Sequence, residues 1–221
     1  SLVIALCVSA SAALAAPFAY VTSLRPIDVF GTTQTLVVLD LATDTVTATV
    51  PVRFLFGAVA VDPTGSRVYV ATITNVSVLD AATNTIIDEI PIAYQSVLAV
   101  NPAGTRLFAM ADASPTTMTV VDTATNSIVG SVPLSGSFAH VVASNTAVYV
   151  LSSSLSGAST LEVLEGDCIA VRQRIDLLPN AVEIAIDPAG TRLYVTHQDP
   201  HRVSVIDTAT NAVIATVPVL N

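Results

Sequence analysis

One pattern recurs five times along the chain, and this repeat constrains the fold more than any other feature. An acidic residue that follows two aliphatic residues returns at intervals of 40 to 43 residues, at Asp40, Asp80, Asp122, Glu165 and Asp207. Eleven residues after each acid stands Pro51, Pro91, Pro133, Asp176 or Pro218. Because apolar residues alternate with Thr and Ser on both sides of each acid, the pattern predicts a strand–turn–strand unit copied five times.

A second hairpin is predicted between these units. Its turns read Asp62-Pro63-Thr-Gly65, Asn101-Pro102-Ala-Gly104 and Asp187-Pro188-Ala-Gly190. The Asp or Asn side chain caps such a turn, proline presets one φ angle, and glycine supplies a positive φ. We therefore interpret the recurrent Asp, Asn and Thr residues as structural. The same interpretation covers Arg67, Arg106 and Arg192 and the aromatic residues Tyr69, Phe108, Tyr149 and Tyr194.

Two hairpins in each repeat predict an all-β fold, a β-propeller of about five four-stranded blades. The predicted blades cover approximately residues 17–52, 53–92, 93–134, 135–177 and 178–221. The first blade begins with its second strand, at Phe18–Thr22, so it is expected to lack its innermost strand. An open arc, a fragment of a seven-bladed ring and a five-bladed ring are the alternatives that follow.

The last repeat resembles the YVTN family of β-propeller repeat proteins. The resemblance is carried by Asp187-Pro-Ala-Gly-Thr-Arg-Leu-Tyr-Val-Thr196 and by the segment from Arg202 to Pro218, and it extends over residues 18–221. It implies propeller blades, commonly seven in a ring, and a likeness to surface-layer-associated proteins. The fourth repeat departs from the pattern, with Gly166–Ile169 and Ser144–Thr146 in place of the two usual turns.

The N-terminal residues predict an export signal. Leu2–Leu14 is apolar, and Ala13–Ala16 provides a small-residue cleavage site, so residues 1–16 are interpreted as a signal peptide. A first β-strand or a membrane anchor is the alternative. Export places the protein in the periplasm, on the cell surface or in the medium. After residue 16 no apolar run approaches the roughly 18 residues that span a bilayer, so no transmembrane span is expected in the mature chain.

Charge and motif content exclude several functional classes. The formal net charge is −9 and all eight basic residues are Arg, so nucleic acid is not an expected partner. The two cysteines, Cys7 and Cys168, would not pair once the signal is removed. The chain has no nucleophile elbow, His-Glu-x-x-His, Cys-x-x-Cys-His or phosphate-binding loop. We therefore predict no cofactor, no metal site and no catalytic residues.

The candidate binding face is the one where the repeats differ from each other. The hairpin turns are nearly identical, whereas the remaining loops differ in every blade and by strand direction surround the mouth of the channel. The candidate ligand-binding residues there are His140, Glu183, Arg53, Tyr94, Asp112, His197, Asp199 and His201. His140 and Glu183 hold equivalent positions on the innermost strands of blades four and five, where two adjacent polar groups could bind a ligand or a cation. For this pair the alternative is a hydrogen bond that tunes packing, and for the others a solvated loop residue.

These observations predict an exported, non-enzymatic propeller that binds a protein, glycan or small ligand through the variable loops. The expected partner is a protein or glycan at the cell surface or in the periplasm. One alternative is a lactonase-like hydrolase with its site at the channel mouth. Another is a structural module of a surface layer.

Overall fold

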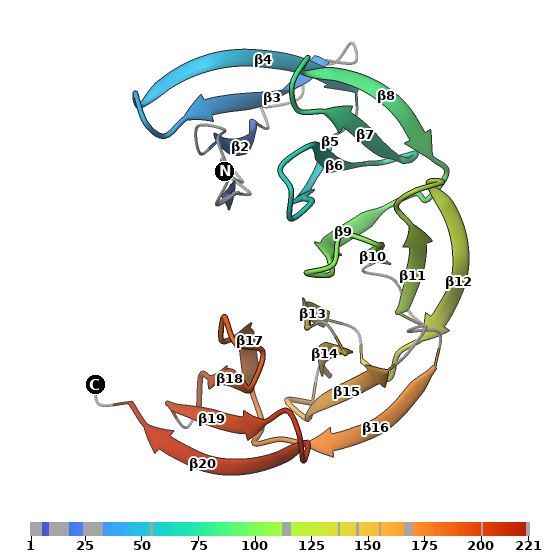
Figure 1. The fold of residues 1–221 in the computed structure, drawn as a ribbon. Helices are drawn as coiled ribbons and strands as arrows, with labels where there is room; N and C mark the ends of the chain where they lie inside the picture. The colour runs from blue at the N-terminus through green and yellow to red at the C-terminus, as the bar shows by residue number, and fades with distance from the viewer. Residues whose placement is uncertain are drawn as a thin grey trace. The chain divides into compact units, whose positions relative to one another are not determined.

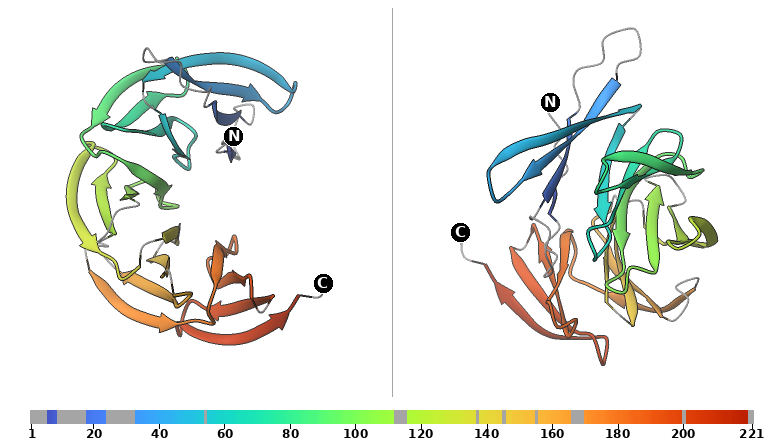
Figure 2. Two further views of the ribbon diagram at one scale, coloured as in Figure 1. Left: turned by 180° about the vertical axis from the view of Figure 1, so that it is seen from behind. Right: turned by 45° about the horizontal axis from the view of Figure 1, so that its top comes forward.

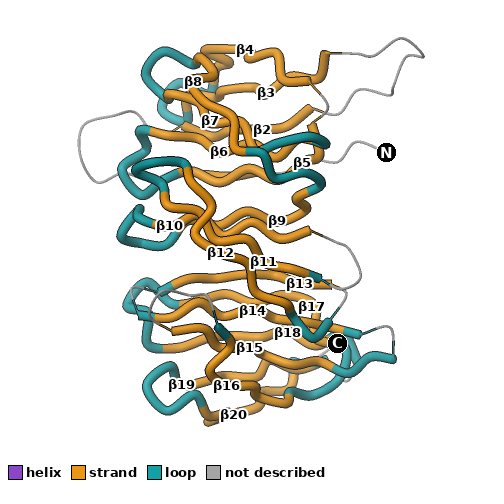
Figure 3. The backbone as a smooth tube through the Cα atoms, turned by 90° about the vertical axis from the view of Figure 1, so that its right-hand side faces the viewer, coloured by secondary structure: helices purple, strands orange, loops and turns teal. Residues whose placement is uncertain are grey.

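A computed structural model describes residues 6–8, 18–23, 33–53, 55–111, 116–136, 138–144, 146–154, 156–165, 170–199 and 201–219. Throughout these ranges the regular structure is β-strand, with no helix (Figure 3). The chain forms two compact units. The first comprises residues 1–111 and 121–128, and the second comprises residues 112–120 and 129–221.

The strands form five antiparallel sheets in which hydrogen-bonded neighbours are consecutive in the sequence (Figure 1). The first sheet contains β1 (Leu6–Val8), β2 (Phe18–Ser23), β3 (Thr33–Asp40) and β4 (Thr45–Arg53). The second contains β5 (Leu55–Val61), β6 (Arg67–Thr72), β7 (Val76–Asp80) and β8 (Thr85–Ile90). The third, which has residues in both units, contains β9 (Gln95–Val100), β10 (Arg106–Ala111), β11 (Thr117–Asp122) and β12 (Ser127–Pro133).

The other two sheets belong to the second unit. The fourth contains β13 (Phe138–Ala143), β14 (Ala147–Ser153), β15 (Ser159–Glu165) and β16 (Val171–Asp176). The fifth contains β17 (Ala181–Ile186), β18 (Arg192–His197), β19 (Arg202–Asp207) and β20 (Ala212–Pro218). They lie side by side in the gold-to-red part of Figure 2. The predicted arrangement of two hairpins in each repeat is thus confirmed.

The first sheet has the three long strands that the sequence predicted. A further strand of three residues, β1, pairs antiparallel with β2 through Leu6↔Val21, Cys7↔Tyr20 and Val8↔Ala19. The innermost position is therefore occupied by residues that the sequence assigned to the export signal. An apolar, partly β-branched segment can satisfy the free backbone groups at the edge of β2, which explains the pairing. Export and removal of residues 1–16 stay predictions.

The repeated turns have the predicted geometry. Gly65, Gly104 and Gly190 have φ angles of 72°, 70° and 71°, and each glycine amide donates to the carbonyl of the Asp or Asn three residues earlier. In the other turn Asp44, Asn84, Asn126 and Asn211 all adopt a left-handed φ of 53° or 54°. Asn and Asp tolerate this region better than other residues with a side chain, so the turn chemistry read from the sequence is confirmed.

Each unit is held together by apolar faces that pack between neighbouring sheets. In the first unit one buried cluster joins the first two sheets around Tyr20, Leu36 and Val70, and a second extends from Tyr69 to Leu107. In the second unit the cluster lies between the fourth and fifth sheets. The last strand of the second and of the fifth sheet, by contrast, is mostly exposed. The outermost strands β8 and β20 therefore face solvent, while the core lies between the inner strands.

A β-bulge recurs where the third and fourth strands of a sheet pair. The register shifts between Val38 and Leu39, Val78 and Leu79, Val163 and Leu164, and Val205 and Ile206. A bulge leaves one extra residue on one strand and bends it. The outermost strand of each of these four sheets is bent at the same point of the repeat.

Candidate functional site

The predicted pair of polar residues on the first strands of the fourth and fifth sheets comes together. Atom Nδ1 of His140 lies 3.1 Å from Oε1 of Glu183, a distance at which an imidazole N–H donates to a carboxylate. Each residue is third in its strand, β13 or β17, near the end where the variable loops enter. Their side chains remain 44% and 61% exposed. The pair is therefore accessible to a ligand while its geometry is held by both strands.

The variable loops beside this pair are tied together through Asn180, at a φ of 56°. Its backbone amide donates to the carbonyl of Gly157 (2.8 Å) and its side-chain amide donates to the carbonyl of Asp199 (3.1 Å). The amide of Gln198 in turn donates to the carbonyl of Asn180 (3.0 Å). Glycine suits position 157 because its φ is 86°, and a Cβ there would also lie 2.7 Å from Oδ1 of Asn180. These loops are thus held in one arrangement before any ligand arrives.

His197 lies next to the same loops but is buried, with 4% exposure. Its Nε2 atom is 2.9 Å from the hydroxyl of Ser204 and its Nδ1 atom is 3.2 Å from the carbonyl oxygen of Pro179. Both ring nitrogens therefore have partners within the protein. In this arrangement His197 holds β18, β19 and the loop before β17 together, and it has no free ring nitrogen for a ligand.

The other predicted residues do not join the pair in one cluster. Asp199 and His201 are exposed. The backbone carbonyl of Asp199 accepts from the Asn180 side chain, and that of His201 accepts from the Val219 amide. Tyr94 belongs to the first unit, is 58% exposed and has a φ of 58°. Arg53 ends β4, but its side chain lies outside the described residues, as does all of Asp112. A ligand role for these residues stays a prediction.

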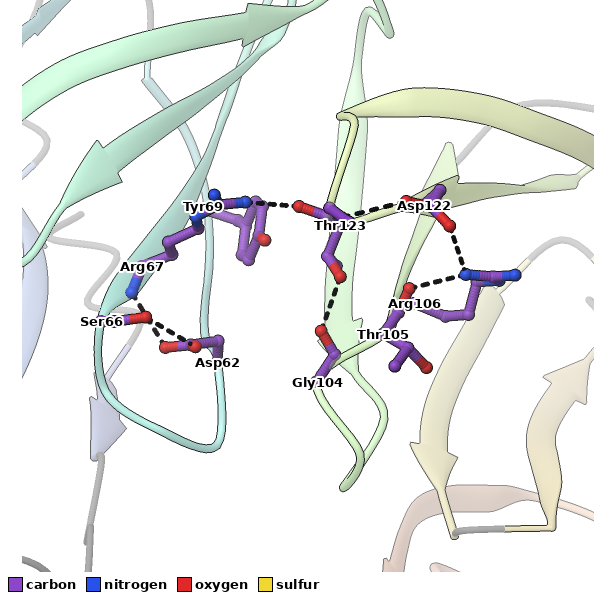
Figure 4. A pocket seen from close by; sticks show the side chains of 10 residues that line it. Asp62, Ser66, Arg67, Tyr69, Gly104, Thr105, Arg106, Asp122 and Thr123 are labelled. Atoms are coloured by element: carbon purple, nitrogen blue, oxygen red, sulfur yellow. Dashed lines mark hydrogen bonds and ion pairs between the residues drawn. The ribbon is translucent and has the colours of Figure 1, made fainter.

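The structure also shows a cavity that the sequence did not predict, and it lies at the repeated turns of the first unit. Its volume is about 370 Å³. Figure 4 shows residues of the second sheet on one wall and residues of the third sheet on the other. The lining residues are Asp62, Ser66, Arg67, Tyr69, Gly104, Thr105, Arg106, Asp122, Thr123 and Ala124. Sequence reasoning assigned these residues to structure alone, because they belong to the most regular part of the repeat.

Ion pairing and turn hydrogen bonds shape the charges in this cavity. Arg106 donates to Oδ2 of Asp122 at 2.6 Å. Hydrogen bonds from the backbone amides of Thr125 and Ala124 and from the Thr125 hydroxyl, together with the nearby Arg106 charge, lower the pKa of Asp122. Arg67 donates from Nη1 to the carbonyl of Thr123. Burial raises the pKa of Tyr69, although the neighbouring Arg67 acts in the opposite direction.

A buried carboxylate on β15, Glu162, was also missed. It is fully buried and accepts from Nε of Arg174 (2.9 Å), the hydroxyl of Ser152 (3.1 Å) and the amide of Ser135 (3.2 Å). Glu162 shares its strand with Ser159, Thr160 and Glu165, and its partners lie 10 to 27 residues away, so nothing in the sequence marks it as the buried acid. Its full set of hydrogen bonds indicates an anchor for the loop before β13.

Two absences apply to the described part of the chain. No group of three or more His, Cys, Asp or Glu residues there could hold a metal ion. No helix among those residues is long and apolar enough to cross a bilayer.

The five antiparallel sheets, each built from two consecutive hairpins, define the chain as a β-propeller protein. Hydrazine synthase of Kuenenia stuttgartiensis has a similar structure, with a TM-score of 0.74 and 21% identity, over 90% of this chain and 63% of that one. The dihydro-heme d1 dehydrogenase NirN, in complex with DHE, is similar with a TM-score of 0.66 and 18% identity, over 84% of this chain and 42% of that one.

These similarities show the fold, and the chain spans less than two thirds of the length of either structure. No protein-family model and no curated protein sequence matches the chain.

Proposed function

We propose that the chain is an exported, non-enzymatic propeller of the YVTN type that binds a glycan, protein or small ligand through its variable loops. The observation that carries the proposal is the contact between His140 and Glu183, which joins two first strands at the loop end and remains exposed. Export rests on the apolar N-terminal segment, and the YVTN assignment rests on the repeat pattern.

The chemistry of the pair suits recognition of hydroxyl groups. With Nδ1 of His140 directed to the carboxylate, the imidazole presents Nε2, for which no partner exists among the described residues. Glu183 offers acceptor capacity that a single hydrogen bond does not fill. Sites that bind polar ligands typically place such groups, here an imidazole nitrogen beside a carboxylate, on a preorganised surface. Little entropy is then lost, because the side chains are already ordered before the ligand binds.

A glycan array tests the proposal. The full chain is expected to bind a subset of glycans, and a His140→Ala/Glu183→Ala double variant is expected to bind them at least about tenfold more weakly, the effect of losing roughly 1.4 kcal/mol. Val46→Ala is the control, because Val46 is exposed on β4 and is not one of the candidate ligand-binding residues. Equal binding by the double variant and the wild type would contradict a role for the pair.

The hydrolase alternative assigns His140 and Glu183 a catalytic role in place of a binding role. If His140 acted as a general base oriented by Glu183, the chain would hydrolyse lactones, and turnover would fall by about 10²–10⁴-fold in His140→Ala. Lactone turnover that depends on His140 would replace the binding proposal by the enzymatic one. Glycan binding without turnover would favour binding.

A further inference from the structure

The cavity at the repeated turns belongs to the first unit, whereas His140 and Glu183 of the proposed loop site belong to the second, so the two sites share no residue. Its volume of about 370 Å³ falls at the lower end of the range of roughly 300–1,000 Å³ that is typical of small-molecule sites. Its lining combines polar and apolar surface, and Ser66, Thr105 and Thr123 are among the residues that form it. A cavity of this size and mixed character suits a small ligand that carries both hydroxyl groups and a carbon skeleton.

The carboxylates in the cavity already have hydrogen-bond donors. Asp62 accepts from the hydroxyls of Thr64 (2.5 Å) and Ser66 (3.0 Å) and from the backbone amide of Arg67 (2.9 Å). Asp122 accepts from the turn amides that follow it and from Arg106. A carboxylate has about four acceptor positions, so these acids have little capacity left for a ligand.

The donors, in contrast, are largely unused. Arg67 carries five N–H donors, and within the described residues its guanidinium donates one hydrogen bond, to the carbonyl of Thr123. The Tyr69 side chain is fully buried, and its hydroxyl has no hydrogen-bond partner in the same part of the chain. Figure 4 shows the Tyr69 ring beside the Arg67 side chain, facing the wall that Thr123 and Gly104 form. Buried hydroxyls are nearly always paired, so an unpaired one beside a cavity indicates a missing acceptor.

We propose that this cavity binds a small sugar acid, whose carboxylate accepts hydrogen bonds from Arg67 and Tyr69. Guanidinium groups bind carboxylates through charge-assisted hydrogen bonds, and the Tyr69 hydroxyl adds a neutral donor at the same place. The ligand hydroxyls face Ser66 and Thr105. The charges of Arg67 and Arg106 balance those of Asp62 and Asp122, so the lining carries no net negative charge that would repel the carboxylate.

Isothermal titration calorimetry on the full chain tests this proposal with glucuronate as the probe and glucose as its neutral counterpart. We expect glucuronate to bind and glucose to bind at least about tenfold more weakly. Tyr69→Phe removes an unpaired hydroxyl and is expected to keep the fold while weakening glucuronate binding about tenfold. Arg67→Lys keeps the charge but loses the planar donor set of the guanidinium group, so this variant is also expected to bind glucuronate more weakly.

Tyr149→Phe is the matched control, because Tyr149 is the equivalent residue of the fourth sheet and its hydroxyl already has a partner. It should leave glucuronate affinity unchanged. Three results would each overturn the proposal: no glucuronate binding at about 10 mM ligand, equal affinity for glucose, or unchanged affinity in both Tyr69→Phe and Arg67→Lys. None of them bears on the loop site, whose variants lie in the second unit.

Discussion

The second and fourth sheets carry a tyrosine at the same position of the repeat, Tyr69 and Tyr149, but the two hydroxyl groups differ in their hydrogen bonding. In the second sheet Arg67 donates to the carbonyl of Thr123, and the buried hydroxyl of Tyr69 remains unpaired among the described residues. In the fourth sheet Ala147 stands at the position of Arg67. There the hydroxyl of Tyr149 donates to a carbonyl instead.

The carbonyl that accepts is the equivalent one in both cases. Thr123 and Thr208 each follow the acid of their repeat, and each donates its own hydroxyl to a glycine carbonyl, of Gly104 (2.6 Å) or Gly190 (2.8 Å). Tyr149 donates to Thr208 at 3.5 Å. Arg67 of the second sheet therefore takes an acceptor that Tyr69 would otherwise use, and the Tyr69 hydroxyl beside the cavity keeps an unused donor.

The two sheets also differ at the centre of their third strand. Glu162 of the fourth sheet occupies the register position of Ser77 in the second. Ser77 donates to Oδ1 of Asn75 at 3.2 Å, a local contact. Glu162 instead accepts hydrogen bonds from Ser135, Ser152 and Arg174, which lie 27, 10 and 12 residues away in the sequence. The fourth sheet thus has a buried carboxylate, Glu162, where the second sheet has a short polar side chain, Ser77.

The largest expected effect concerns this buried charge. Glu162→Ala would leave the Ser135 amide and the Ser152 hydroxyl without an acceptor and create a void, and is expected to lower the free energy of unfolding by about 3 kcal/mol. Chemical denaturation followed by circular dichroism measures the loss. Ser77→Ala is the matched control and should cost under about 1 kcal/mol. Similar losses in the two variants would show that Glu162 is not an anchor.

A smaller effect is expected at the two tyrosines. Tyr149→Phe removes a hydrogen bond and should lower the free energy of unfolding by about 0.5–1 kcal/mol, whereas Tyr69→Phe should be neutral. In an Arg67→Ala background the Thr123 carbonyl becomes available, and Tyr69→Phe should then become costly as well. A Tyr69→Phe variant that is as destabilised as Tyr149→Phe in the native background would contradict the assignment of an unpaired hydroxyl.

The smallest effect is expected in the pH dependence of stability. It distinguishes a turn held by a carboxylate, that of Asp80, from a turn held by a hydroxyl, that of Ser144. Hydrogen bonds from Thr83 lower the pKa of Asp80 in the folded state. Because the folded pKa is depressed, this carboxylate stabilises the fold at pH values above its unfolded pKa of about 3.9, and the contribution is lost as the pH falls through the folded pKa. Urea midpoints between pH 7 and pH 3 should therefore fall less steeply for Asp80→Asn than for the wild type.

The control for this titration is Ser144→Ala. Ser144 accepts from the amides of Thr146 (3.2 Å) and Ala147 (3.0 Å) in the hairpin turn of the fourth sheet, and it has no titratable group. Its variant should follow the wild-type pH profile with a constant offset. If the urea midpoint of Asp80→Asn fell with pH as steeply as that of the wild type, Asp80 would contribute nothing to the loss of stability in acid.

The fold was largely predictable because its signals are local. Asp62 and Gly65 form their turn within a few residues, so sequence spacing alone predicts it. The contact between His140 and Glu183 was found by counting register along equivalent strands. The cavity could not be found in this way, because it depends on Arg67 reaching a carbonyl 56 residues away. Glu162 is a similar case, with a partner amide 27 residues earlier in the chain.

The recurrent bulge has a consequence for how such a chain can change in length. Since the register shift falls at the same point of the repeat in four sheets, every such repeat carries the bend of its outermost strand within its own sequence. Duplication or deletion of a whole repeat would preserve strand pairing on both sides, whereas a gain or loss of one residue beside the bulge would turn the side chains of that strand to the opposite face. Whole repeats are therefore the natural unit in which this protein gains or loses sequence.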